Sequence, residues 1–343
     1  MKLLVLGGTL FLGRHLVAAG LEHGHRVTTF TRGRTNPGLF PEAETLHGDR
    51  NTDLRTLTGR TWDVVVDTSA YVPRQAADAA ATLRSQIDRY CLISTGSVYA
   101  KFPQGGANED TVTHAPPDDP EGAEKPEAYG PLKLGCERTI IDAFGDRALV
   151  VRPGVLAGPH DPTGRLGYWV HRVAAGGEVL APGNPEHPVQ LLDARDLAAW
   201  LITLLETGGA GVFNTSGPLT PLTMDALLQS CRTESASNAR LTWVDDAFLL
   251  EQGVKPWSDL PLWLPAEVPG PLLDSRRAYL AGLRCRPLRD TMRDVLADDV
   301  NIQQVEGGPP RPGAISRDRE RELLRLWHAG RGPVAGSSRL TRA

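Results

Sequence analysis

Cysteine and long apolar runs are scarce in this 343-residue chain, and these absences exclude several classes of protein. No apolar run approaches the roughly 20 residues of a membrane helix, and the N-terminal run at 1–6 is too short for a signal sequence, so we expect no membrane partner. The cysteines show no C-x-x-C spacing, which favours reduced packing residues in a cytoplasmic protein over disulfides or a zinc site. There are four of them: Cys91, Cys136, Cys231 and Cys285.

Positive charge is not in excess either. The formal net charge is -4 and the sequence pI is about 6.2, so nothing attracts the chain to nucleic acid in general and small molecules are the expected partners. The motifs Gly-x-Ser-x-Gly and Gly-x-x-x-x-Gly-Lys-Ser/Thr are absent, which argues against a serine hydrolase and a phosphate-transfer enzyme. His23 and His25 have no third ligand near them in the sequence, so we interpret them as a solvated turn and predict no metal site.

What the chain does contain is an alternation of short strands and helices. Strand-like runs occur at 2–6, 25–30, 45–47, 62–67, 89–94 and 148–152, with an alanine-rich helical segment at about 73–85. The run at 64–66 is three valines, which suits a parallel strand buried on both faces. With 41% hydrophobic residues available for a core, we predict an α/β fold, a Rossmann doubly wound parallel sheet.

Beyond residue 152 the pattern becomes mixed, with helices expected at about 166–175, 196–206 and 222–231. We predict a Rossmann domain at 1–160 and a smaller mixed α/β substrate-binding portion at 161–305, partly interleaved with the sheet. Residues 306–343 are expected to be a tail with one helix at 317–328 and a flexible end. Residues 101–128, rich in Pro, Gly and acidic residues, are expected to form a loop over the site.

A glycine turn follows the first strand and opens the first helix. It runs Gly7-Gly8-Thr9-Leu10-Phe11-Leu12-Gly13, with Leu10 where the middle glycine of Gly-x-x-Gly-x-x-Gly is usual. At this position a dinucleotide pyrophosphate would meet backbone amides and the positive end of a helix. We therefore predict that this turn binds a dinucleotide cofactor.

Tyr129 and Lys133 are spaced i and i+4, so both side chains lie on one face of a helix. A tyrosine that acts as a base near pH 7 needs its pKa lowered by roughly 3 units, about 4 kcal/mol. An ammonium at about 4 Å supplies roughly that much at an effective dielectric of 20. The helix cannot begin much before residue 127, because Pro131 is tolerated only in the first turn.

Thr95 follows the fifth predicted strand, in the stretch Ser94-Thr95-Gly96-Ser97-Val98-Tyr99. Together with the glycine turn and the Tyr129/Lys133 pair, this stretch resembles the extended short-chain dehydrogenase/reductases of the NAD-dependent epimerase/dehydratase family. Further similar stretches are 108–110, Arg152-Pro153, Gly158-Pro159, 193–198 and 286–288. The opening looks most like an atypical branch that includes chloroplast stem-loop-binding proteins.

The resemblance implies catalytic roles for Thr95, Tyr129 and Lys133, with Lys133 holding the nicotinamide ribose and lowering the pKa of Tyr129. It also implies cofactor contacts from the glycine turn, Tyr129, Lys133, Asp49, Arg50 and Pro153. The substrate contacts that we expect are Ser97, Tyr99, His160, Trp169 and Gln190. The cofactor is NAD or NADP, and Arg32 at the end of the second strand favours NADP slightly, because a 2'-phosphate would meet a positive charge.

We therefore predict an enzyme that transiently oxidises a secondary alcohol of a sugar, nucleoside or nucleotide-sugar substrate. One departure is that Gly96 and Ser97 stand where family dehydratases often place an acid pair, so dehydration would need its acid from elsewhere. The alternatives are a simple NADP-dependent reductase or dehydrogenase and a Rossmann-fold RNA-binding protein without redox chemistry. Epimerisation, dehydration and net reduction stay open, as does a homodimer.

Overall fold

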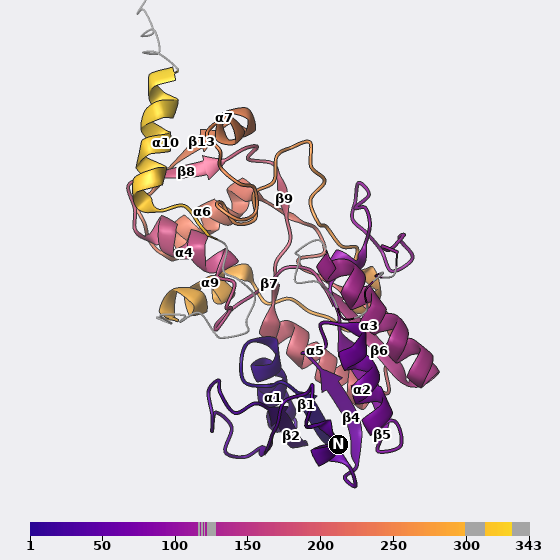
Figure 1. Ribbon diagram of the computed structural model, residues 1–343. Coiled ribbons are helices and arrows are strands. Elements are labelled where there is room, and N and C mark those ends of the chain that lie inside the picture. The colour runs from indigo at the N-terminus through magenta and orange to yellow at the C-terminus, as the bar shows by residue number, and fades with distance from the viewer. Residues whose placement is uncertain (116, 118, 120, 122–127, 299–312, 331–343) are drawn as a thin grey trace, which may run out of the picture.

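Seven parallel strands form the central sheet of the computed structural model (Figure 1), which describes the chain except residues 116, 118, 120, 122–127, 299–312 and 331–343. The strand order is β11-β6-β5-β4-β1-β2-β3, and each neighbouring pair is parallel. This is a doubly wound order with its switch point beside β1, which confirms the predicted fold class. The strands are β1 (Lys2–Leu6), β2 (Arg26–Thr31), β3 (Glu44–His47), β4 (Trp62–Asp67), β5 (Ile87–Ile93), β6 (Ala148–Pro153) and β11 (Gly211–Thr215).

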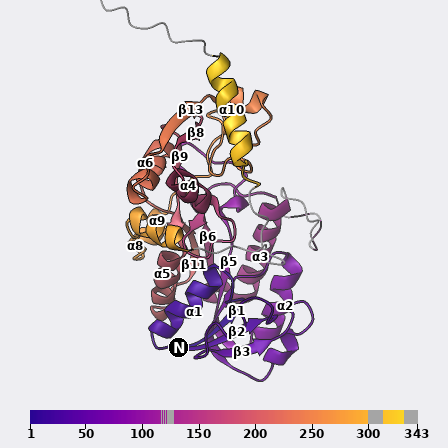
Figure 2. The ribbon, with the colours of Figure 1, turned by 90° about the vertical axis from the view of Figure 1, so that its left-hand side faces the viewer.

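The central strands are buried on both faces, as their uninterrupted apolar runs predict. Leu3 and Val5 of β1 lie in one core with helices α1 (Leu12–Glu22) and α5 (Ala194–Glu206). Leu4 and Leu6 lie in a second core with α2 (Pro73–Leu83) and α3 (Tyr129–Phe144). Successive strand residues point to opposite faces, so one short run fills both layers. Figure 2 shows the two helical layers on either side of the sheet.

The C-terminal portion builds a separate hydrophobic core around Trp169 and Trp263. Helix α10 is attached to it by a buried ion pair, in which Arg172 Nε lies 2.6 Å from Glu320 Oε2. The helix predicted at 317–328 is therefore present and packed. The elements are β7 (Leu156–Ala157), α4 (Arg165–Ala174), β8 (Glu178–Pro182), β9 (Pro188–Val189), β10 (Leu192–Asp193), β12 (Leu222–Thr223), α6 (Met224–Glu234), β13 (Arg240–Val244), α7 (Asp246–Glu251), α8 (Arg276–Leu280), α9 (Leu288–Ala297) and α10 (Arg317–Gly330).

The chain crosses between these two parts more than once. After β8 and β9 have joined the C-terminal core, residues 192–215 return to the sheet as α5 and β11. The two parts of the chain are therefore interleaved, because α5 and β11 belong to the sheet. Strand β11 was not predicted, because its short sequence becomes a strand through its pairing with β6, where Phe213 lies opposite Val151.

Two predicted features fall partly or wholly outside the described residues: the loop at 101–128 and the end of the tail at 331–343. Within the described ranges, none of the helices combines the length and the apolar character needed to cross a membrane.

Candidate active site

The turn after β1 has a shape that glycine alone accommodates without strain. Gly7 and Gly8 have φ angles of 110° and 112°, a region that side chains disfavour. A Cβ on Gly13 would lie 2.7 Å from the Gly8 backbone nitrogen, so α1 approaches the turn too closely for a side chain. Phe11, the N-cap of α1, makes no side-chain hydrogen bond to the helix end. The turn therefore fits a pyrophosphate, with amides of 9–12 as the expected donors.

A pocket of about 230 Å³ opens beside this turn. Its lining includes Thr9 from the turn, Thr31 at the end of β2 and His47 at the end of β3. The segment after β2 is held over the turn, since Asn36 Nδ2 donates to the Thr9 carbonyl oxygen at 2.8 Å. Hydroxyl and imidazole groups in a space of this size are suited to a ribose and its substituents.

Three charged side chains lie near the ends of β2 and β3. Arg32 and Arg34 are exposed, and both contribute to lowering the pKa of Asp49, after the larger effect of a hydrogen bond from the Asn51 backbone amide. The positive charge predicted for this region is present, but one carboxylate stands beside it.

Arg50, which was predicted to contact the cofactor, makes structural contacts within the chain. Its Nη1 and Nη2 donate to the two carboxylate oxygens of Asp67 at 2.7 and 3.0 Å, and Nη2 also donates to the Gln75 carbonyl oxygen at 3.0 Å. Asp67 is fully buried at the end of β4 and also accepts from the Tyr90 hydroxyl at 2.6 Å. The bidentate pair thus ties the segment after β3 to the end of β4.

Thr95 lies two residues after the end of β5 and is the N-cap of a short 3-10 turn, η2 (Gly96–Val98). Its Oγ1 accepts from the Ser97 amide at 3.1 Å and donates to Ser97 Oγ at 3.2 Å. Ser97 is exposed and Thr95 is half-buried. The carboxyl edge of the sheet therefore carries two adjacent hydroxyl groups, at the position expected for groups that hold a substrate oxygen.

Tyr129 is the first residue of α3, as the Pro131 argument predicts. The helix rests closely on η2, because a Cβ on Gly130 would lie 2.1 Å from the Ser97 carbonyl oxygen. Partial desolvation raises the pKa of Tyr129 to about 12, and Tyr71 adds to the rise. A hydrogen bond with the Thr95 side chain and the charge of Arg165 act in the opposite direction. At neutral pH the free protein therefore holds this phenol in its protonated form.

Lys133 lies one turn further along α3 and is buried, with 3% of its surface exposed. Its Nζ donates to the carbonyl oxygens of Ala70 at 2.7 Å and Ile93 at 2.6 Å, at the ends of two neighbouring strands. Because an ammonium has three donors, these bonds leave one N–H for another acceptor. Burial lowers the pKa of Lys133. In this structure two of the three ammonium donors of Lys133 are hydrogen-bonded to backbone carbonyls and not to the Tyr129 phenol.

Sequence reasoning missed two side chains that lie near Tyr129. Tyr71 follows β4, and its ring centroid is 5.8 Å from Lys133 Nζ. Arg165 begins α4, and its guanidinium carbon lies 5.8 Å from the Trp257 ring centroid. Within the described part of the chain, the buried Nε of Arg165 has no hydrogen-bond partner. The position of Tyr71 after a central strand was the only sequence signal for either residue.

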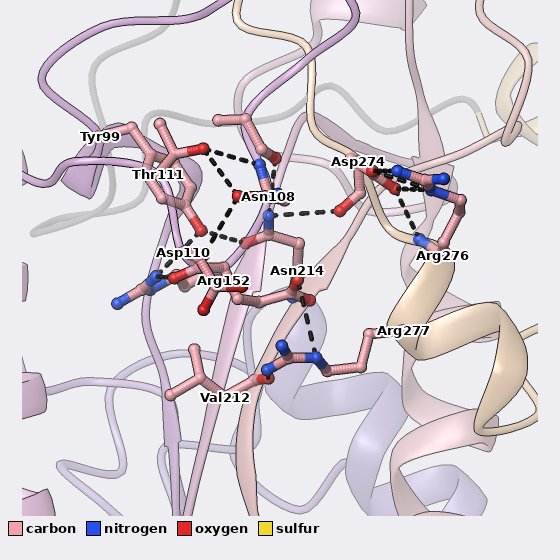
Figure 3. Close-up of polar contacts among 12 residues, drawn as sticks. Tyr99, Asn108, Asp110, Thr111, Arg152, Val212, Asn214, Asp274, Arg276 and Arg277 are labelled. Atoms are coloured by element: carbon pink, nitrogen blue, oxygen red, sulfur yellow. Dashed lines mark hydrogen bonds and ion pairs between the residues drawn. The ribbon is translucent and has the colours of Figure 1, made fainter.

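Tyr99, which was predicted to contact the substrate, belongs to a buried polar network, shown in Figure 3. Its hydroxyl donates to Asn214 Oδ1 at 2.7 Å and accepts from Arg152 Nη1 at 2.9 Å. Asn214 Nδ2 donates in turn to the Ala107 carbonyl oxygen at 2.8 Å, and Arg152 Nη2 lies 2.6 Å from Glu137 Oε2. The network joins β6 and β11 to the segment that follows η2.

Gln190 is buried and hydrogen-bonds to the backbone of Leu273. Its Oε1 accepts from the Leu273 amide at 2.9 Å, and its Nε2 donates to the Leu273 carbonyl oxygen at 3.2 Å. The Leu273 side chain in turn packs against Gly96. Both polar groups of Gln190 are therefore committed to the backbone and not to a substrate. Pro153 ends β6 at the carboxyl edge of the sheet, where a cofactor contact was predicted.

Trp169 is fully buried, and its indole N–H donates to the Pro261 carbonyl oxygen at 2.7 Å. Its ring faces are enclosed in the C-terminal core, so the structure does not support the prediction that it stacks on a substrate.

His160 lies against α1, on the cofactor half of the molecule. Its ring stacks on His15 with a centroid distance of 6.3 Å, and its backbone amide donates to Asp298 Oδ2 at 2.6 Å. Nε2 of His15 lies 3.2 Å from the Pro159 carbonyl oxygen. Burial lowers the pKa of His15 to about 4, so this ring is neutral near pH 7. The 158–161 segment and α1 thus share an interface in which the His15 and His160 rings stack.

Thr95 and the first turns of α3, which carry Tyr129 and Lys133, therefore lie together at the carboxyl end of β5, where α3 packs on η2. A phenol hydrogen-bonded to a threonine hydroxyl can hold an alcohol or carbonyl oxygen and exchange a proton with it. The remaining N–H of Lys133 and the glycine turn lie on the side of the sheet where a dinucleotide would be bound.

Comparison with known proteins agrees with this geometry. Residues 3–215, more than half of the chain, match the NAD dependent epimerase/dehydratase family. The chloroplast stem-loop binding protein of 41 kDa b from Arabidopsis thaliana is 26% identical over 255 residues. That similarity covers 67% of this chain, and the chain spans 62% of the relative's length.

Solved structures of nucleotide-sugar epimerases share the fold. UDP-N-acetylglucosamine 4-epimerase from Bacillus cereus is 18% identical, with a TM-score of 0.66 over 92% of this chain and 100% of that one. UDP-glucuronic acid 4-epimerase from Bacillus cereus, in complex with NAD, is 18% identical, with a TM-score of 0.64 over 90% and 99%. UDP-glucose 4-epimerase from Thermotoga maritima, with UDP-glucose, is 17% identical, with a TM-score of 0.64 over 87% and 98%.

Proposed function

Because this chain belongs to the NAD dependent epimerase/dehydratase family, we propose that it transiently oxidises a secondary alcohol of a sugar, nucleoside or nucleotide sugar and then returns the hydride. The observation that carries the proposal is the placement of three side chains: Thr95 stands at the turn on which Gly130 of α3 packs, Tyr129 begins that helix, and Lys133 lies one turn further, where its Nζ donates to two backbone carbonyls. Family membership also confirms the resemblance seen in the sequence.

In this proposal Thr95 holds the substrate oxygen and Tyr129 exchanges its proton. Lys133 donates its remaining N–H to a ribose hydroxyl, and the glycine turn binds the pyrophosphate. A bound nicotinamide dinucleotide would supply the hydride acceptor and donor. The oxidised carbon makes the adjacent C–H acidic, so one phenol serves epimerisation or elimination without a metal. The pKa of Tyr129, about 12 in the free protein, must fall before the phenol acts as a base.

The cofactor preference follows from charge at the end of β2. Arg32 and Arg34 stand beside a single carboxylate, that of Asp49, which leaves one net positive charge for a 2'-phosphate. We therefore favour NADP over NAD for this chain, although its family is NAD-dependent.

Arg165 is an argument for an anionic substrate. The charge of its guanidinium lowers the pKa of Tyr129, and its buried Nε lacks a hydrogen-bond partner within the described residues. A buried unpaired donor of this kind costs free energy unless a ligand satisfies it. A phosphate or carboxylate of the substrate would do so, and nucleotide sugars carry such groups.

The proposal is tested with UDP-glucose, UDP-N-acetylglucosamine and UDP-glucuronic acid, each deuterated at C4. Deuterium retained in the product, without net NAD(P)H formation, is the expected result. Stoichiometric deuterium in free cofactor would instead show a simple dehydrogenase or reductase. Mass spectrometry of the small molecules released on denaturation would identify a retained cofactor independently.

An RNA-binding function without redox chemistry is the second candidate, because the curated relative bears a stem-loop-binding name. The net charge of -4 disfavours it, since affinity for phosphates comes mainly from lysine and arginine. Salt-dependent binding of a stem-loop RNA with no affinity for either dinucleotide would support this alternative. A cytoplasmic location and a homodimer stay predictions.

A further inference from the structure

Lys133 carries a positive charge into the interior of the protein. Its side chain is buried, and Nζ donates to the carbonyl oxygens of Ala70 and Ile93 at 2.7 and 2.6 Å. In the part of the chain that the structure describes, this nitrogen forms no ion pair with a carboxylate. Burial of an ammonium without a counter-ion disfavours its charged form, so other groups have to stabilise the charge.

Tyr71 is the aromatic side chain beside this charge. Its ring centroid lies 5.8 Å from Nζ, within the roughly 6 Å over which a ring face attracts a cation. Tyr71 directly follows Ala70, so the ring and one of the two accepting carbonyls come from the same short segment. The Tyr71 amide donates to Gln75 Oε1 at 2.8 Å, and α2 begins two residues later at Pro73. These local contacts hold the ring in a defined position next to the ammonium.

The Tyr71 ring is uncharged at neutral pH. Desolvation and the charge of Asp67 raise the pKa of its phenol, although Arg50 acts in the opposite direction. The phenol therefore keeps its proton, and the ring acts on Lys133 through the negative face of its π system and not as a phenolate.

The other titratable groups around Lys133 act on its charge in both directions. Burial lowers the pKa of Lys133, and the charge of Arg50 adds to the fall. Three groups on α3 and at the end of β4 raise it: Cys136, Asp67 and Glu137. The two carboxylates are already paired, with Arg50 at 2.7 Å and with Arg152 at 2.6 Å, so neither is a dedicated partner of Lys133. The Tyr71 ring differs from all of these groups, because its removal changes no formal charge.

We propose that Tyr71 is a positioning residue that keeps Lys133 in its ammonium form through a cation–π interaction. Its importance for catalysis rests on the proposed function, in which Lys133 donates its remaining N–H to a ribose hydroxyl. A charged donor forms a stronger hydrogen bond than a neutral amine does. The side chain after β4 thus contributes to the catalytic group through Lys133, without contacting the substrate.

The test follows the titration of Lys133 directly, by carbon-13 NMR of the full chain labelled at the lysine ε-carbon, from about pH 6 to about pH 11. The experiment is tractable because the sequence contains five lysines, and Lys133→Arg identifies the signal of Lys133. Three of the other lysines are exposed and serve as internal references: Lys2, Lys101 and Lys255.

Tyr71→Leu removes the π system and keeps an apolar side chain. It should lower the pKa of Lys133 by roughly half a unit to one and a half units, the range expected for a cation–π contact. Tyr71→Phe is the matched control, because it keeps the ring face and removes only the hydroxyl group. In this control, and in Tyr71→Trp, the pKa of Lys133 should not fall. Tyr71→Met repeats the test with a second apolar side chain, and at 48% exposure the position tolerates such changes.

Calorimetric titration of the same proteins with NADP separates this proposal from the proposed function. If Lys133 titrates as expected but the unmodified chain binds neither NADP nor NAD, the cofactor role fails and the assignment of Tyr71 stands. The assignment itself is overturned if the pKa of Lys133 is unchanged or higher in Tyr71→Leu and Tyr71→Met. It is also overturned if Tyr71→Phe lowers that pKa as much as Tyr71→Leu does.

Discussion

Glu137→Gln is the substitution whose cost the structure defines most sharply. The Glu137 carboxylate accepts from Arg152 Nε at 3.0 and 3.2 Å and from Nη2 at 2.6 Å, and it also accepts from the Ser94 hydroxyl. The two charged side chains are 1% and 7% exposed. Glutamine keeps the shape, so no cavity forms and the change isolates the charge.

Removing this carboxylate leaves the Arg152 guanidinium buried without a counter-charge. Breaking a buried pair from one side costs about 3–5 kcal/mol. At about 1.4 kcal/mol per factor of ten, the unfolding equilibrium constant should rise by roughly two to three and a half orders of magnitude. The measurement is urea denaturation followed by tryptophan fluorescence and by circular dichroism.

The matched control is Glu322→Gln, which breaks the pair with Arg319 at 2.7 Å, where the side chains are 51% and 34% exposed. Water screens this pair, so its loss should cost at most about 1 kcal/mol. Removing both buried charges, in Glu137→Met with Arg152→Met, should cost less than Glu137→Gln alone. Equal losses in Glu137→Gln and Glu322→Gln would refute the assignment of a buried charge pair.

Four further outcomes are expected. Tyr129→Phe should bind cofactor normally in calorimetry but lose about 10²- to 10⁴-fold in kcat/KM, and unchanged turnover would exclude it as the proton-transfer group. Gly130→Ala should lower both thermal stability and kcat, because its Cβ would lie 2.1 Å from the Ser97 carbonyl oxygen. Gly38→Ala is its control, because a Cβ there meets no atom within 4 Å and the only strain comes from the positive φ. Arg32→Ala should reduce NADP affinity more than NAD affinity, and equal losses would contradict the charge argument. The pKa of His15, about 4, lies below its ordinary value of about 6.5, so its stabilising effect is complete above pH 6.5 and is lost as the pH falls toward 4. His15→Gln should therefore flatten the stability profile by up to about 3 kcal/mol in that window, and an unchanged profile would rule this out.

The helices and strands that carry the candidate site can be predicted from short stretches of sequence. The valines at 64–66 suit a strand buried on both faces, and a glycine turn between the first strand and the first helix is typical of a dinucleotide-binding fold. Tyr129 and Lys133 share a helix face because 3.6 residues make a turn. These features depend on residues close in the sequence, so the fold class and the placement of Tyr129 and Lys133 on one helix were both open to prediction.

The roles of other candidates depended on partners far along the chain. Tyr99, Trp169 and Gln190 are side chains that serve equally well in a binding site or in a core. Their partners Asn214, Pro261 and Leu273 lie 115, 92 and 83 residues away, and only the folded chain brings them together.

Dependence on a distant partner also explains why the sequence prediction for His23 and His25 differs from their contacts in the structure. From the sequence, His23 and His25 lack a third ligand and read as a solvated turn. Tertiary packing of α1 against α5 places Glu206 within 3.0 Å of both rings. Local sequence determined the sheet, the turn and the catalytic spacing through short-range geometry. Burial and ion pairing were decided by tertiary structure, because each depends on which distant side chain fills the space beside a given atom.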